Sequence, residues 1–102
     1  MDSGKSVIDP ISIQTIRACL ERQFVDVKFS QAIRPTFIFN SGVGKPSWHL
    51  ICHEQFLADH TSREELQHFV ENKVLPKALN NPGKRIQISK FGDITVEEKN
   101  PS

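Results

Sequence analysis

The sequence predicts an α+β fold with two helices packed on one face of a mainly antiparallel sheet of about five strands. Hydrophobic residues recur every three to four positions in two segments and every second position in five others, in the order α-β-β-β-α-β-β. Seven Phe and one Trp, with no Tyr, supply large rings that favour burial. The 102 residues contain no repeat or linker, so we expect one domain over 1–102, with mobile ends at 1–8 and 97–102.

The first helix is predicted over residues 10–23. Asp9 can accept hydrogen bonds from free amides at the start of the helix, and Pro10 suits the first helical position. The apolar stripe consists of Ile13, Ile16, Leu20 and Phe24.

The period then changes to two, which predicts a strand over residues 24–30. Val25, Val27 and Phe29 should face the core, and Asp26 and Lys28 should face the other way. The strand ends before Pro35, which cannot donate to a central ladder.

Residues 36–40 and 48–53 are predicted to form a hairpin with a long glycine-containing tip. Alternation places one set of side chains toward the core, namely Phe37, Phe39, Trp48, Leu50 and Cys52. The opposite set is Thr36, Ile38, His49, Ile51 and His53.

A helix beginning near Pro46 remains an alternative for the second half of this hairpin, because Trp48, Ile51, Cys52 and Phe56 also fit helical spacing. The β-branched and aromatic content favours the strand. The choice matters for metal binding: on a strand, His49 and His53 lie about 13 Å apart and cannot share an ion. On a helix they would be adjacent.

The second helix is predicted from a capping box at Ser62 and Glu65 to about Leu75, where Pro76 should end or kink it. A further turn over 77–79 is compatible with the pattern. The buried stripe consists of Leu66, Phe69, Val70 and Val74.

The last hairpin is predicted from the alternation of Ile86 with Ile88 and of Ile94 with Val96. We expect a three-residue loop at 91–93, which places Ile88 opposite Val96.

Charge argues against nucleic acid as a partner. The chain carries 13 basic and 12 acidic residues, mixed along its length, for a formal net charge of +1. The order α-β-β-β-α is similar to that of double-stranded-RNA-binding domains, but Glu64 and Glu65 at the start of the second helix would repel phosphates. The glycine-containing loop 42–45 lacks a phosphate-loop pattern, since Pro46 stands where Ser or Thr is needed.

Cys19 and Cys52 are predicted to be buried free thiols, because both have apolar neighbours. No apolar run approaches the ~18–20 residues of a membrane span, and residues 1–10 lack the apolar segment of a secretory signal. We therefore expect a cytoplasmic protein without membrane contact, and the residues suggest no metal or other cofactor.

The candidate binding surface is the second face of the sheet, since two helices of this length cover one face only. The side chains expected there are Lys28, Thr36, Ile38, His49, Ile51 and His53. This mixture is too apolar for a plain solvent face and too polar for a core, and it favours contact with a partner. The prediction is a non-enzymatic interaction or regulatory module that forms a homodimer or binds a protein. Coverage of this face by the final hairpin or tail remains an alternative.

A second hypothesis is a small-molecule binder or small enzyme with a pocket near His49, His53, Glu54 and His60. Segment 53–60 is the one stretch in which several titratable groups gather. A nucleic-acid-associated protein is the third and least favoured hypothesis.

Overall fold

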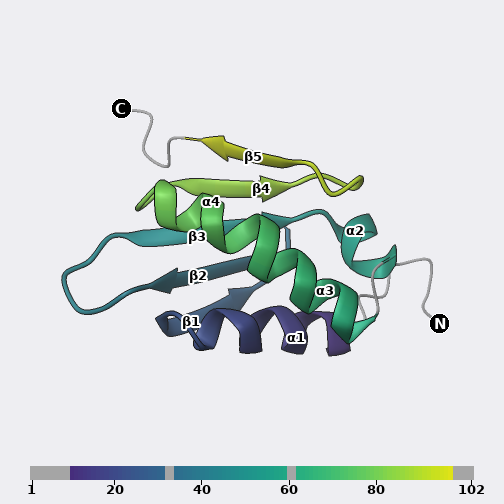
Figure 1. Cartoon of the computed structure of the whole chain (residues 1–102), viewed down its shortest axis with the longest axis horizontal. Helices are drawn as coiled ribbons and strands as arrows, with labels where there is room; N and C mark the ends of the chain where they lie inside the picture. Colours follow the sequence, from purple (N-terminus) through teal and green to yellow (C-terminus); the bar gives the residue numbers. More distant parts are fainter. Residues whose placement is uncertain (1–9, 32–33, 60–61, 98–102) are drawn as a thin grey trace.

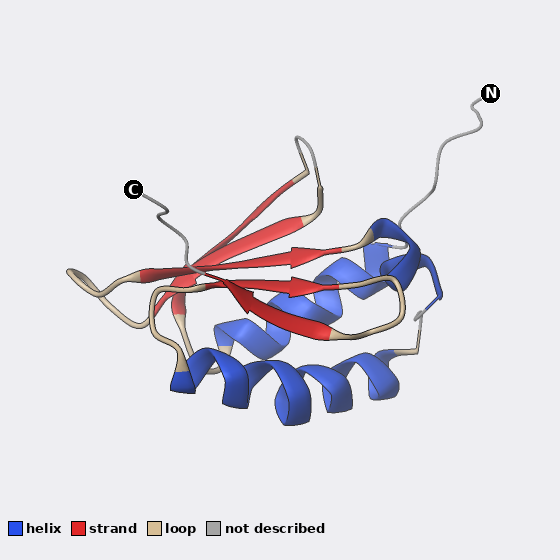
Figure 2. Ribbon diagram, turned by 90° about the horizontal axis from the view of Figure 1, so that it is seen from above, coloured by secondary structure: helices blue, strands red, loops and turns tan. Residues whose placement is uncertain are grey.

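Residues 10–31, 34–59 and 62–97 are described by the structure, a computed structural model of the chain, and they form a helical layer on one side of a five-stranded sheet (Figures 1 and 2). The helical elements are α1 (Pro10–Glu21), α2 (Glu54–Asp59), α3 (Arg63–Phe69), the π-helical turn η1 (Val70–Val74) and α4 (Leu75–Asn80). The strands are β1 (Val25–Ser30), β2 (Thr36–Asn40), β3 (Ser47–Cys52), β4 (Arg85–Ile88) and β5 (Ile94–Glu97). The predicted α+β class is confirmed, with α2 as an additional short helix.

The strands lie in the sheet in the same order as in the chain, β1-β2-β3-β4-β5. All neighbours are antiparallel except β3 and β4, which are parallel and are joined by the helical segment α2 to α4. The final hairpin therefore extends the sheet at one edge, and it does not fold over the second face.

The central hairpin forms as predicted, with Phe39 opposite Trp48 and Ile38 opposite His49. The alternative of a helix through Cys52 is wrong, because β3 runs to Cys52 and α2 begins only at Glu54. His53 was predicted to be the last residue of this strand, and it lies outside it.

Strand β1 differs from its prediction at its first residues. Val25 was expected to face the core, but it is 51% exposed, whereas Val27 is buried. Asp26 has a φ of 55°, and the register with β2 shifts between Val25 and Lys28. A left-handed residue rotates the chain locally, so the side-chain alternation is interrupted at this bulge.

The second long helical segment starts at the predicted cap, where the Ser62 Oγ accepts a hydrogen bond from the Glu65 amide at 3.4 Å. It does not end near Leu75 but continues to Asn80. The turn before Pro76 widens, and the Leu75 amide donates to the Val70 carbonyl five residues earlier. This π turn lets the chain pass the proline, which has no amide donor of its own, without ending the helix.

The β4–β5 turn was predicted one residue too late. Ser89 donates its amide to the Asp93 carbonyl at 2.9 Å, so the loop is 90–92, with Gly92 at φ 87° in the last loop position. Ile88 consequently lies opposite Ile94, and not opposite Val96 as predicted. The shift is two residues in register, so the side chains keep their predicted faces. Glu97, predicted to belong to a mobile end, is the last residue of β5.

The core lies between the helices and the sheet and contains the predicted aromatic residues Phe37, Phe39 and Trp48. The Trp48 indole donates to the carbonyls of Ala78, at 2.8 Å, and Asn81, at 3.0 Å. It thereby ties β3 to the end of α4. Among the described residues, no helix combines the length and the hydrophobicity that crossing a membrane requires.

Candidate functional site

The face of the sheet opposite the helices is the candidate site, and Figure 2 shows that α1, α3 and α4 all lie on the other side. Strand pairing arranges its side chains in two rows across the five strands. One row is Lys28, Ile38, His49, Arg85 and Glu97. The next row is Ser30, Thr36, Ile51, Gln87 and Thr95. We call these ten residues the open face.

The centre of the open face is partly apolar. Ile38 and Ile51 are half-buried and lie on neighbouring strands, where Ile38 pairs with His49 and Ile51 pairs with Thr36. The two isoleucines are therefore diagonal neighbours, close enough for their side chains to form one apolar spot.

Opposite charges occupy the two edges of the open face. Lys28 lies on β1 at one edge and Glu97 on β5 at the other. A Glu97 oxygen accepts from the Gln87 amide at 2.7 Å and lies 3.9 Å from an Arg85 nitrogen. The Nε of Arg85 is buried and has no hydrogen-bond partner among the described residues.

The structure brings together five of the six residues predicted for this face, namely Lys28, Thr36, Ile38, His49 and Ile51. The sixth, His53, lies one residue beyond the end of β3. The Nδ1 of His53 accepts a hydrogen bond from the Gln55 amide at 3.0 Å, and the Leu57 amide donates to the His53 carbonyl at 3.3 Å. His53 thus caps the start of α2, a short helix that the sequence did not predict.

The sequence did not reveal Ser30 of β1 or the four residues that β4 and β5 contribute to the open face. The alternation of Ile86 with Ile88 and of Ile94 with Val96 predicted the two strands, but no local signal showed that β4 pairs with β3. The parallel register, with His49 beside Arg85 and Ile51 beside Gln87, is a tertiary property of the chain.

The alternative pocket near His49, His53, Glu54 and His60 gains no support from the cavities of the molecule. Five cavities of about 250 to 530 Å³ are lined mainly by helical residues, one of them also by the β4–β5 turn, and none of these five has His49, His53 or Glu54 in its wall. His60 lies outside the described residues.

The two thiols are buried and free. Complete burial raises the pKa of Cys52 from 9.0 to about 12, so this sulfur stays protonated at neutral pH. A protonated, inaccessible thiol is a poor nucleophile and metal ligand. Cys52 is therefore a core residue, as its face on β3 predicts.

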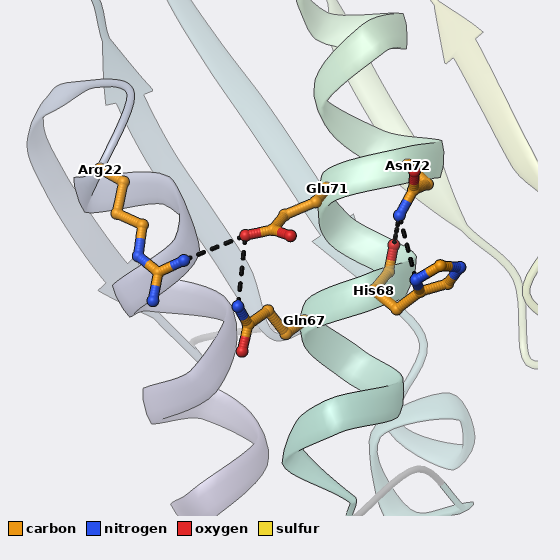
Figure 3. A network of polar contacts seen from close by, with 5 residues as sticks. All are labelled: Arg22, Gln67, His68, Glu71 and Asn72. Carbon is orange, nitrogen blue, oxygen red and sulfur yellow. Dashed lines mark hydrogen bonds and ion pairs between the residues drawn. The ribbon is translucent and has the colours of Figure 1, made fainter.

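A polar network covers part of the helical layer, on the side of the molecule away from the open face (Figure 3). The Glu71 carboxylate accepts from Arg22, the residue after α1, at 3.0 Å and from Gln67 at 3.4 Å, and Asn72 donates to the His68 carbonyl at 2.8 Å. These contacts connect α1 to η1 and occupy the carboxylate, so we interpret the network as structural.

In the described part of the chain, no three His, Cys, Asp or Glu side chains gather closely enough to hold a metal ion. Comparison of the chain with protein-family models, with curated proteins and with solved structures found no match.

Proposed function

We propose that the protein is a non-enzymatic interaction module that associates with a second copy of itself through the open face. The observation that carries this proposal is the half-buried pair Ile38 and Ile51 at the centre of a sheet face over which none of the described helices lies. Partly apolar faces of this kind are typical of protein contact surfaces.

The charges on the open face favour a second copy as the partner. In a face-to-face dimer with its two-fold axis along β3, the β1 strand of one subunit lies over β5 of the other. Lys28 then faces Glu97 of the partner subunit at both ends, and Ile51 faces Ile51 of the partner subunit at the centre. An axis between β2 and β3 would instead place Lys28 over the partner's Arg85, where two cations repel.

The size of the open face implies a weak and reversible dimer. Five strands about 4.8 Å apart and about 17–20 Å long present a flat patch of roughly 450 Å². A standard stable interface buries about 800 Å² on each partner. We therefore expect association in the high micromolar range, detectable by analytical ultracentrifugation at high protein concentration.

The first test is the variant Ile51→Lys. Because the residue lies on the proposed axis, two ammonium groups would face each other, and the dimer should dissociate while thermal stability stays near that of the unmodified chain. Lys45→Glu, on the exposed β2–β3 loop, is the matched charge control and should leave the sedimentation profile unchanged. A protein that remains monomeric at high micromolar concentration, or one whose mass is insensitive to Ile51→Lys, contradicts the proposal.

A pair of charge variants tests the orientation of the two subunits. Lys28→Glu and Glu97→Lys should each weaken self-association by placing like charges over one another. A mixture of the two variants should associate preferentially as a heterodimer, by about three- to tenfold over either homodimer, because both edge contacts then join opposite charges. Fluorescence energy transfer between the separately labelled variants measures this preference, and equal association in all three combinations excludes the proposed axis.

The state of the cysteines supports a cytoplasmic location for this module. Both cysteines are buried free thiols, as is usual for proteins in a reducing compartment.

A further inference from the structure

The outer edge of β5 presents backbone groups that no described strand satisfies. Strand β5 is the last of the sheet, and Figure 1 shows it beyond β4 with no other described helix or strand on its outer side. The pairing with β4 decides which of its groups point outward. Ser89 and Asp93 form a hydrogen-bonded pair across the ladder, and such pairs alternate with non-bonded ones.

This alternation directs the backbone of Ile94 and Val96 away from β4. In the same ladder Ile88 lies opposite Ile94 and Ile86 opposite Val96. The His53 amide donates to the Ile88 carbonyl at 3.1 Å, which shows that Ile88 uses its backbone groups toward the other side of β4. The amide and carbonyl of Ile94 and of Val96 are therefore free to pair with an added strand.

A groove lies directly beside this edge, on the helical side of the sheet. It has a volume of about 420 Å³ and is bounded by α4 and η1 on one wall and by the start of β5 on the other. Its lining includes Lys73 and Lys77 from the helical wall and Asp93 and Ile94 from the strand. Neither lysine forms an ion pair with another described residue, so the groove carries an excess of positive charge.

The two edges of the sheet differ in their suitability for pairing. The β1 edge is interrupted by the bulge at Asp26, with its φ of 55°. Such bulges prevent the addition of strands. The β5 edge is regular, and the half-buried side chains of Ile94 and Val96 line its helical side.

A second copy of β5 is a poor occupant of this edge. Antiparallel pairing centred on Thr95 places Ile94 opposite the partner's Val96, but it also places Asp93 opposite the partner's Glu97. Like charges directly opposite one another are destabilising. The lysines of the groove favour a different strand, one that carries negative charge.

We propose that the β5 edge and the adjoining lysine-lined groove bind an extended acidic peptide by strand addition. The backbone of the peptide pairs with Ile94 and Val96, and its side chain opposite Ile94 enters the groove beside Lys73 and Lys77. Because side chains alternate along a strand, acidic residues at every second position of the peptide all point toward the groove. The surface and its occupant are both different from those of the face-to-face dimer, and either proposal can fail alone.

The test uses the full chain and a capped hexapeptide of alternating Glu and Thr, with a peptide of alternating Lys and Thr as its charge control. Chemical-shift perturbation and amide hydrogen exchange, recorded by NMR on the isotope-labelled protein, locate the contact. The expected result is protection of the Ile94 and Val96 amides by the acidic peptide alone. Protection elsewhere, or no binding at millimolar peptide, overturns the proposal.

Variants separate backbone pairing from generic charge attraction. Val96→Pro removes an outward amide donor of the protein without removing a bond to β4, and methylation of the peptide's backbone nitrogens removes the peptide's own donors without altering the protein. Each should weaken binding by about tenfold, as should the double variant Lys73→Glu with Lys77→Glu. Lys28→Glu, at the opposite edge, should have no effect on peptide affinity. Equal binding of the methylated and unmethylated peptides, or self-association abolished by Val96→Pro, would overturn the proposed occupant.

Discussion

Among single residues, the core aromatics pack closely against one another. The Phe39 ring stacks on Trp48 with centroids 5.6 Å apart and contacts Phe24 at 4.7 Å. Leu66 of α3 is completely buried on the opposite side of the same core. Because the core is closely packed at these positions, a smaller side chain would leave a cavity.

We expect Phe39→Ala and Leu66→Ala each to lower the free energy of unfolding by ~2–5 kcal/mol. Val43→Ala, at a fully exposed loop position, is the control and should change it by less than about 0.5 kcal/mol. Denaturant titration followed by circular dichroism measures all three variants. A loss below ~1 kcal/mol for both core variants would refute the core assignment.

The buried Cys52 thiol predicts a loss of stability at alkaline pH. In the unfolded chain this thiol ionises near pH 9.0, but burial raises its folded pKa to about 12. The unfolded state therefore loses the proton first, so stability is complete below pH 9.0 and falls as the pH rises toward about 12.

The loss attributable to Cys52 amounts to at most about 4 kcal/mol over this interval. Cys52→Ala should remove this part of the pH dependence, although the smaller side chain lowers the stability at neutral pH. The chain has no tyrosine to titrate in the same range, and the lysines are common to both proteins. Parallel slopes for the two proteins between pH 9 and 11 would contradict the assigned pKa.

At the scale of elements, the β2–β3 loop packs against the turn between α4 and β4. Gly83 has a φ of 73°, and a Cβ atom at this position would lie 2.9 Å from the Cβ of Pro46. Gly44 has a similar φ of 78°, but nothing lies within 4 Å of its added Cβ. Substitution of either glycine would strain the backbone to a similar degree, but only at Gly83 would the new side chain also collide with a neighbouring atom.

Gly83→Ala should therefore destabilise the protein more than Gly44→Ala, by about 1 kcal/mol or more in thermal or chemical unfolding. Gly44→Ala reports the cost of the left-handed backbone alone, about 1 kcal/mol. Equal losses for the two variants would indicate that the contact between the loop and the turn does not form in solution.

Elements with strong local signals were predictable, and those that depend on their surroundings were not. Strand 36–40 and the Ser62 cap were predicted to the residue. The short helix α2 was missed, because six residues with two buried side chains carry no distinctive period. The β4–β5 register was missed because Gly92 was placed inside the loop, whereas its positive φ makes it the last loop residue.

At the scale of the whole molecule, the sequence predicted which face of the sheet is uncovered but not how wide that face is. Alternation in residues 28–51 was sufficient to find the half built from β1 to β3. The contribution of β4 and β5 depends on a parallel pairing between segments separated by the helical crossover. Pairing at this sequence separation has no local signature, so Arg85 and Glu97 could be assigned to the open face only from the structure.

The position of Trp48 makes the joining of the two halves of the chain optically visible. It is the single tryptophan of the sequence. Its indole donates to the carbonyls of Ala78 in α4 and of Asn81 just after α4, while its strand pairs with β2 and β4. Its emission should therefore shift to longer wavelength whenever α4 detaches from β3, even if each half keeps its own secondary structure. The intrinsic fluorescence of this chain thus reports the closure of the helical layer onto the sheet without any added dye.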